Sequence, residues 1–408
     1  MTKKSDAPAI RFKGFSDAWE QRKAIDIADY SKGNGYSKGD LTDAGTPIIL
    51  YGRLYTKYQF AISEVDTFAV PRNGAVYSQG NEVIVPASGE TAEDIARASA
   101  VEKSGVLLGG DLNILRPFDF INPLFLALAI SNGEPQKELA KKAQGKSVVH
   151  IHNTDIQEVT IVYPSRTEQD RIVSVFRQLD HLITLHQRKF EKLTNVKKSM
   201  LEKMFPQNGS SYPEIRFKGF TDPWEQRKLT EFVESFSGLT YTPNDVQENG
   251  TLVLRSSNVS NGEVVDADNV YVNPQVVNSE NVKVGDIVVV VRNGSRSLIG
   301  KHAQIKAFMP NTVIGAFMTG IRSECPEFTN ALLNTSRFEE EIAMNMGATI
   351  NQITGYMFSK MEFKVPCLDE QKKIGEYFEK LDRLITLHQR ELKKLQNIKK
   401  SMLEKMFV

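Results

Sequence analysis

Two stretches of the chain place apolar residues in alternating steps of four and three, the spacing of a helix that packs along another helix. The positions are Ile172, Phe176, Leu179, Ile183, His186, Phe190 and Leu193 in the first stretch, and Ile374, Phe378, Leu381, Ile385, His388, Leu392 and Leu395 in the second. We call these positions the seam. Each seam contains one histidine, interpreted as a polar residue that sets the register, because no carboxylate or cysteine cluster accompanies it. The pattern predicts two long helices that pack on each other.

The two predicted helices are near copies. Residues 179–205 and 381–407 are identical at 21 of 27 positions. At a rise of about 1.5 Å per residue, a helix from Glu168 to Phe205 would span roughly 57 Å. Two such helices, each continuing from its own domain, are expected to lie antiparallel. The periodicity alone also fits helices that join two chains or that fill a core.

The opening of each half is repeated as well. The segment "IRFKGFSDAWEQRK" at 10–23 returns as "IRFKGFTDPWEQRK" at 215–228, an offset of 205. The offset becomes 202 where "GKSVVHI" (145–151) faces "GATINQI" (347–353), so the first half carries a net three extra residues (205 − 202) between about 110 and 145. Repeats at both ends of each half predict an internal pseudo-twofold arrangement.

Between the repeated segments lie two stretches of similar length that differ almost everywhere. Runs such as "NEVIVP" (81–86) and "DIVVVVR" (286–292) predict strands, whereas "PLFLALAIS" (123–131) and the segment 328–346 predict helices. We therefore expect an α/β (mixed α+β) fold in which two domains are joined by two long antiparallel coiled-coil helices. The linker "PQNGSSYP" (206–213) is expected to be exposed.

These boundaries predict four segments. They are a first domain at 1–163, a central helix and linker at 164–208, a second domain at 209–365 and a C-terminal helix at 366–408.

Composition narrows the class of protein. With 40% hydrophobic and 25% charged residues and no apolar run near the roughly 20 residues that span a bilayer, no membrane role is expected. The first residues lack the apolar stretch of a secretory signal, so we expect a cytoplasmic protein. Two cysteines make neither a disulfide framework nor a zinc motif. A net charge of +1 neither indicates nor excludes nucleic-acid binding.

Motifs of common enzyme classes are missing. The sequence has no phosphate-binding loop of the G-x-x-x-x-G-K-[ST] type, no H-E-x-x-H, no G-x-S-x-G and no calcium loop. It also lacks the N-P-P-Y type motif of amino-methyltransferases. We therefore expect no catalytic residue, no metal site and no bound cofactor, and interpret the chain as a binding protein.

Loops rich in arginine, asparagine, lysine and tyrosine are the candidate binding surfaces. Arginine and asparagine suit hydrogen bonding to guanine and adenine edges, and lysine suits phosphates. Such loops are also common as solvated surface. The candidates in the first half are Lys32, Asn34, Lys38, Tyr51, Arg53, Tyr55 and Lys57, and those in the second half are Tyr241, Arg255, Asn258, Arg292, Asn293, Arg296 and Lys301.

The combined pattern resembles a known family. Each long helix is preceded by P-x-x-x-E-Q-x-x-I, as "PSRTEQDRI" (164–172) and "PCLDEQKKI" (366–374). With two variable domains, a repeated opening and a long helix after each domain, the whole chain resembles the specificity subunit of type I restriction-modification enzymes.

That resemblance implies a function and partners. Two target recognition domains would each read one half of a split site in double-stranded DNA, and the conserved helices would fix the spacer. Two modification subunits would bind S-adenosylmethionine and methylate adenine, and two restriction subunits would use ATP and Mg²⁺ for translocation and cleavage. By the same resemblance, a conserved loop near DNA adds the candidates Lys146, Ser147, Thr349, Asn351 and Gln352.

Two hypotheses follow from the sequence. One is a DNA-recognition subunit without catalysis of its own, and the other is a scaffold that binds no DNA and organises partners through its helices. Nearly identical helices beside divergent domains favour one docking surface used twice and two different half-sites.

Overall fold

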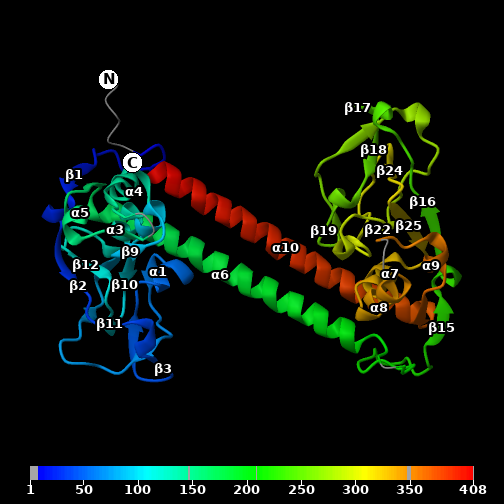
Figure 1. The fold of residues 1–408 in the computed structure, drawn as a ribbon, viewed down its shortest axis with the longest axis horizontal. Coiled ribbons are helices and arrows are strands. Elements are labelled where there is room, and N and C mark those ends of the chain that lie inside the picture. The colour runs from blue at the N-terminus through cyan, green and yellow to red at the C-terminus, as the bar shows by residue number, and fades with distance from the viewer. Residues whose placement is uncertain (1–7, 146–147, 208, 347–350, 408) are drawn as a thin grey trace. The chain divides into compact units, whose positions relative to one another are not determined.

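Packing divides the protein into two units. The computed structural model describes residues 8–145, 148–207, 209–346 and 351–407. Unit 1 comprises residues 1–186 with 391–408, and unit 2 comprises residues 187–390. The long helices α6 (Arg166–Lys203) and α10 (Leu368–Met406) each begin in one unit and end in the other (Figure 1). The predicted pair of long helices is confirmed, and the linear division into four segments stays a prediction.

Unit 1 is built on two five-stranded sheets. The first has the order β2 (Ala28–Lys32), β12 (Leu112–Pro117), β8 (Glu82–Pro86), β10 (Ser99–Val101), β5 (Ala61–Ile62). The second has the order β3 (Leu41–Thr42), β6 (Phe68–Ala69), β4 (Thr46–Ile49), β11 (Ser104–Leu108), β7 (Tyr77–Gln79). Two strand pairs are β1 (Glu20–Lys23) with β14 (Thr160–Tyr163) and β9 (Ser88–Gly89) with β13 (Val149–His150). Every residue of β8 is buried, which explains the apolar run Val83–Pro86 that follows Glu82.

Unit 1 also contains short helices, of which the one at Pro123–Ile130 lies against the first sheet. They are α1 (Arg53–Thr56), α2 (Ala92–Ile95), α3 (Pro123–Ile130), α4 (Gly133–Lys142) and α5 (Asn153–Gln157). The predicted helix over 123–131 is α3, which is apolar all round and therefore buried. The Asn122 side chain caps it by accepting a hydrogen bond from the backbone nitrogen of Leu124, at 2.9 Å.

Unit 2 repeats this plan with smaller sheets. One sheet has the order β16 (Val233–Ser237), β25 (Met318–Ser323), β22 (Ile287–Val290), β23 (His302–Gln304), and the other has the order β17 (Val246–Gln247), β21 (Val270–Val272), β18 (Thr251–Leu254), β24 (Thr312–Ile314). The strand pairs are β15 (Glu225–Lys228) with β26 (Glu362–Val365) and β19 (Val259–Ser260) with β20 (Glu263–Val264). The helices are α7 (Pro326–Leu333), α8 (Ser336–Asn345) and α9 (Gly355–Ser359).

Two local predictions for unit 2 need correction. The segment 328–346 forms parts of two helices, because Thr335 takes an extended conformation before α8 and its hydroxyl donates to the Leu332 carbonyl at 2.6 Å. The linker is exposed at Gly209, Ser210 and Tyr212 as predicted but half-buried at 206–207, 211 and 213, and the Lys364 ammonium donates to the Gly209 and Ser210 carbonyls at 2.5 and 2.6 Å.

A buried ion pair joins each repeated opening to the start of the following long helix. The Arg11 guanidinium donates two hydrogen bonds of 2.7 Å to the Glu168 carboxylate, and Arg216 donates two of 2.8 Å to Glu370. Both carboxylates are almost fully buried, so two planar hydrogen bonds are needed to offset their desolvation. The repeated "IRF" and "EQ" segments are therefore two sides of one contact.

The glutamine of the same motif ties the helix to the preceding proline. The side-chain nitrogen of Gln169 donates to the Pro164 carbonyl at 2.9 Å, and Gln371 makes the same bond to Pro366 at 2.9 Å. This fixes the direction in which each helix leaves the strand before it.

The end of each long helix completes a hydrophobic core. In unit 1, the ring of Phe407 lies 6.1 Å from that of Phe176, between ring centres. In unit 2, Phe205 lies 6.0 Å from Phe378 in the same way. All four rings are buried. The repeated "KKSMLEKMF" thus ends in an aromatic anchor, which explains why the repeat extends beyond the coiled-coil pattern.

Ion pairs show that α6 and α10 run antiparallel. In unit 1 the Asp180 carboxylate lies 2.5 Å from the Lys399 ammonium, and in unit 2 Asp382 lies 2.6 Å from Lys197. The two aspartates occupy one position of the repeat and the two lysines another, so the pairs are related by the pseudo-twofold arrangement. Lys197 of α6 and Lys399 of α10 are therefore engaged in equivalent pairs.

The seam packs on more than the opposite helix. Its first three positions in each copy are buried within the unit cores, namely Ile172, Phe176 and Leu179 in unit 1 and Ile374, Phe378 and Leu381 in unit 2. The later seam positions, Ile183, His186, Phe190, Leu193, Ile385, His388, Leu392 and Leu395, are half-buried. The start of each seam thus belongs to the core of its unit, and only the later seam positions lie outside that buried core.

This packing predicts separate effects for the two anchors. Phe407→Ala should lower the free energy of unfolding of unit 1 by about 3 to 5 kcal/mol, since it leaves a cavity in a closed core, and Phe205→Ala should do so in unit 2. Hydrogen exchange followed by mass spectrometry should show protection lost in β8 and α3 for the first variant and in β22 and α7 for the second. Phe308→Ala is the control, because that side chain is 79% exposed. Equal loss in both units for either variant would contradict the assignment.

Candidate nucleic-acid interface

Two candidate loops of unit 2 lie side by side. The loop after β22 forms an antiparallel bridge with the segment before α9, in which Arg292 faces Gln352. The backbone nitrogen of Ile353 donates to the Val291 carbonyl at 2.8 Å. Candidates that are far apart in sequence therefore form one surface.

Asparagines hold this surface together. The Asn293 amide donates to the Ser256 hydroxyl at 3.0 Å, and the Asn351 amide donates to the Gly294 carbonyl at 3.0 Å. The side-chain oxygen of Asn293 also accepts a hydrogen bond from the backbone of Ser295 at 2.9 Å. Both asparagines therefore support the loop, whatever else they contact.

The arginines of unit 2 differ in what they bind. Arg255 donates to the Asp268 carboxylate at 2.5 Å. Arg292 and Arg296 are exposed, and neither makes an ion pair with any described residue. The Arg292 guanidinium instead lies over the ring of Phe317, 4.8 Å from its centre. Two uncompensated positive charges on one loop make it the stronger candidate for contact with an anion.

Three other candidates of unit 2 are placed differently. Asn258 is only 1% exposed, and its amide donates to the Ala267 carbonyl at 2.8 Å and to the Asn269 side chain at 2.9 Å, so it shapes its own turn. Tyr241 packs on a small buried cluster. Lys301 is half-buried between the 292–296 loop and β23.

Unit 1 brings together the corresponding segments. Strand β9 pairs with β13, so that Ser88 faces His150. The Ser88 hydroxyl lies 3.1 Å from Nδ1 of His150, and the Tyr55 hydroxyl donates to the Ser88 carbonyl at 2.8 Å. Burial raises the pKa of Tyr55, which keeps its hydroxyl protonated. Candidate Tyr55 thus supports the loop after β8.

The remaining candidates of unit 1 are mostly engaged within their own loops. Arg53 has a side chain only 8% exposed and contacts the Asp66 carboxylate at 2.7 Å. Lys57 reaches the same carboxylate at 2.6 Å, and its bond is the main cause that lowers the pKa of Asp66 to about 2. Tyr51 packs edge-on against Tyr55.

The loop over 32–40 stays exposed at the candidate positions. Lys32, Asn34 and Lys38 are all exposed, and the Asn34 amide donates to the Gly74 carbonyl at 2.7 Å. Lys146, Ser147 and Thr349 lie outside the described residues.

Sequence reasoning missed three residues at these loops. Phe317 reaches Arg292 only through the pairing of β22 with β25, which no local pattern reveals. Ser88 and His150 could have been found, because they stand at the repeat positions of Asn293 (88 + 205) and Gln352 (150 + 202).

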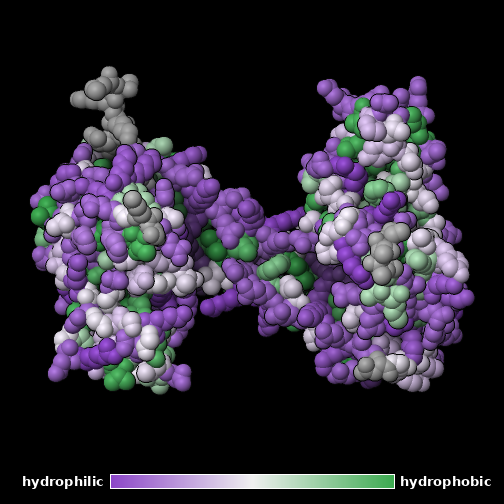
Figure 2. Space-filling view, viewed as in Figure 1, coloured by the Kyte–Doolittle hydropathy of each residue, from purple (hydrophilic) through white to green (hydrophobic). Residues whose placement is uncertain are grey.

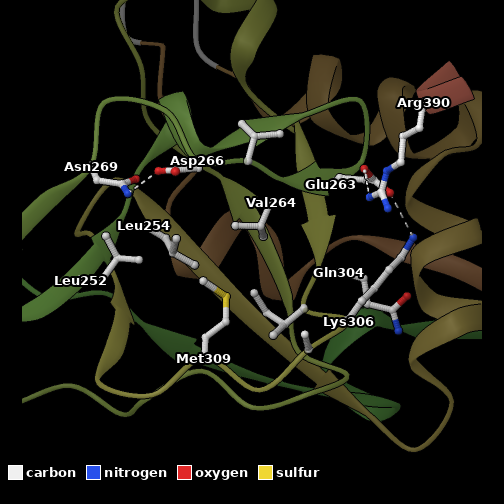
Figure 3. Close-up of a pocket in the computed structure, with 13 residues that line it drawn as sticks. Leu252, Leu254, Glu263, Val264, Asp266, Asn269, Gln304, Lys306, Met309 and Arg390 are labelled. Carbon is white, nitrogen blue, oxygen red and sulfur yellow. Dashed lines mark hydrogen bonds and ion pairs between the residues drawn. The ribbon is translucent and has the colours of Figure 1, made fainter. Parts of the chain in front are cut away.

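Unit 2 also contains a cleft of about 480 Å³. Its floor is apolar and consists of Leu252, Leu254, Val264 and Met309 (Figure 3). At one end the Glu263 carboxylate lies 3.9 Å from the Lys306 ammonium and 3.6 Å from the Arg390 guanidinium. Asp266 adds a second carboxylate to the lining. Two carboxylates and two basic side chains balance in the lining, and the floor is apolar, so the cleft lacks the net positive charge that favours phosphate.

The described residues contain neither a candidate metal-binding cluster nor a candidate membrane-spanning helix. No group of three or more histidine, cysteine, aspartate or glutamate side chains is gathered as a metal site among them. None of the helices in that part of the chain combines the length and apolar character needed to cross a membrane.

Comparison with known proteins gives a family. Residues 16–195 and 221–397 match the family described as "Type I restriction modification DNA specificity domain". The MjaVIII specificity subunit of Methanocaldococcus jannaschii is 23% identical over 343 residues, which cover 81% of this chain and 79% of that protein. The EcoKI specificity subunit of Escherichia coli is 30% identical over 172 residues, covering 40% and 36%.

A solved structure has the same fold. The crystal structure of the type I restriction-modification S subunit from M. genitalium superposes with a TM-score of 0.67 at 16% identity, covering 98% of this chain and 99% of that one. Because the family match includes both variable domains and most of both long helices, this chain belongs to the type I restriction-modification DNA specificity family and contains its domain twice.

Proposed function

We propose that this chain is the specificity subunit of a type I restriction-modification complex and reads a two-part site in double-stranded DNA. The observation that carries the proposal is the double match to the DNA specificity family, one in each half. Each unit reads one half-site through the loops described above, and the continuous helices α6 and α10 keep the spacer constant. A scaffold that binds no DNA would leave the unpaired arginines of the 292–296 loop without a role.

The chain has no catalytic step of its own in this proposal. It directs two modification subunits, which use S-adenosylmethionine to methylate adenine, and two restriction subunits, which use ATP and Mg²⁺. The complex works in the cytoplasm. The cofactors belong to those partner subunits.

Exposed leucines on the long helices are the proposed docking points for two identical partners. Leu182 and Leu185 of α6 and their counterparts Leu384 and Leu387 of α10 lie outside the seam and are 38% to 51% exposed. Hydrophobic patches are visible over the middle of the helices in Figure 2. The same apolar pair occurring once in each unit suits the same partner bound twice.

A constant spacer predicts sensitivity to its length. Inserting one base pair moves the second half-site by about 3.4 Å along the axis and rotates it by about 34 to 36°. Loss of two base contacts of about 1 to 3 kcal/mol each should weaken binding roughly 30-fold or more. Equilibrium binding of the assembled complex to DNA with the original and the lengthened spacer measures this.

DNA with the original spacer and a scrambled second half-site is the control, and the lengthened site should bind no better than it. Unchanged binding to the lengthened site would exclude a spacer fixed by the helices.

The docking points predict the partner stoichiometry. Leu185→Glu should remove one modification subunit and Leu387→Glu the other, because each places a charge in an apolar contact. Native mass spectrometry of the purified complex should show the partner number falling from two to one in each single variant and to none in the double variant. Gln187→Glu, an exposed position of the same helix, is the matched control. A double variant that still binds two partners would place the docking surface elsewhere.

Arg296→Ala should weaken binding by about 1 to 3 kcal/mol and relax only one half of the site, as expected for a lost base contact. Binding to a panel of substituted sites measures both quantities. A uniform loss over all sequences, with the salt slope reduced by about 1, would assign Arg296 to a phosphate.

A further inference from the structure

Phe317 is an exposed aromatic residue beneath an exposed arginine. It lies in the loop between β24 and β25, and 54% of it is exposed. Its ring centre lies 4.8 Å from the guanidinium carbon of Arg292. An arginine can stack on such a ring and keep its hydrogen-bond donors directed outward.

The backbone around this pair is fixed from two sides. The Phe317 carbonyl accepts hydrogen bonds from the backbone nitrogens of Val291 and Arg292, at 3.0 and 3.2 Å. On the other side, Arg292 is bridged to Gln352. The backbone of Arg292 is therefore fixed, and the Phe317 ring limits the conformations that its side chain can adopt.

A second stacked arginine in unit 2 shows what is distinctive about Arg292. Arg322 lies over Phe236 at 4.3 Å, but its guanidinium also binds the Asp286 carboxylate at 2.9 Å and Glu280 at 2.5 Å. The charge of Arg322 is therefore already neutralised by carboxylates within the unit. Arg292 has the same support from a ring and no carboxylate among the described residues, so all its donors are available to a ligand.

We infer that Phe317 is a positioning residue that holds Arg292 for a bidentate contact with a guanine in the half-site read by unit 2. The planar fork of arginine matches the O6 and N7 acceptors that guanine presents in the major groove. A guanidinium already stacked on a ring loses less freedom when it binds. This inference rests on the proposed function, because it assumes that unit 2 reads DNA.

The experiment uses the full chain assembled with its partner subunits and a DNA library randomised across both half-sites. Sequencing of bound DNA gives the base preference at each position. Arg292→Gln should abolish one guanine preference, a loss of roughly 10-fold or more in discrimination. Phe317→Leu should lower the same preference by roughly 2- to 5-fold, the expected contribution of an exposed cation–π contact. Phe317→Tyr, which keeps the ring, should retain it.

Several readouts separate positioning from a general structural effect. Phe317→Leu should leave the other half-site's preferences and the salt dependence of binding unchanged. Phe308→Leu is the matched control, since Phe308 is a more exposed phenylalanine of the same unit with no arginine found over its ring in the described residues. It should behave as the wild type does.

Two results would overturn the inference. One is a Phe317→Leu complex with full preference at the guanine that Arg292→Gln loses. The other is an Arg292→Gln complex that binds all sequences more weakly by the same factor, as for a phosphate contact. A wild-type complex that selects no two-part site would instead overturn the proposed function.

Discussion

Burial of the helix ends is the constraint on which the rest of the structure depends. Phe205 and Phe407 each pack in a core that also contains residues distant in the chain, such as Phe378 for Phe205 and Phe176 for Phe407. Unit 1 is therefore completed only by residues 391–408, which follow the whole of unit 2 in the chain, whereas unit 2 is the continuous stretch 187–390. A long, mostly polar helix has little stability in isolation, and packing at both ends supplies it. The buried pairs Arg11–Glu168 and Arg216–Glu370 then set the direction in which each helix leaves its unit.

This constraint fixes the residues of the cores and the helix ends, and it leaves the side chains of the exposed loops free to differ between the two units. The loops after β8 and β22 extend from fully buried strands, so their ends are fixed while their side chains are free to differ. At one matching position of the repeat the first loop has Ala87 and the second has Arg292 (87 + 205). One backbone plan can thus present unlike contact surfaces, which is what a subunit that reads two different half-sites requires.

The sequence predicted the elements that depend on periodicity and repetition. It did not reveal which side chains of the loops are engaged in contacts within the protein. The long helices and the central strands follow from local spacing. The bonds of Arg53 to Asp66 and of Asn258 to its own turn do not, because the same residue types on an open loop would look identical. A matching pair of close backbone approaches was also missed: a Cβ on Gly33 would lie 1.9 Å from the Gly109 carbonyl oxygen, and one on Gly238 would lie 2.1 Å from that of Gly315. Such approaches depend on strand crossings distant in sequence.

The two openings have equivalent surroundings. The backbone nitrogen of Ile10 donates to the Lys405 carbonyl at 3.2 Å, and that of Ile215 donates to the Lys203 carbonyl at 2.8 Å. Lys203 and Ile215 are also connected by the intervening residues 204–214. Ile10 and Lys405 lie far apart in the sequence. The same backbone hydrogen bond thus holds each opening to the end of a long helix, whether that helix precedes the opening in the chain, as α6 precedes Ile215, or follows it, as α10 follows Ile10.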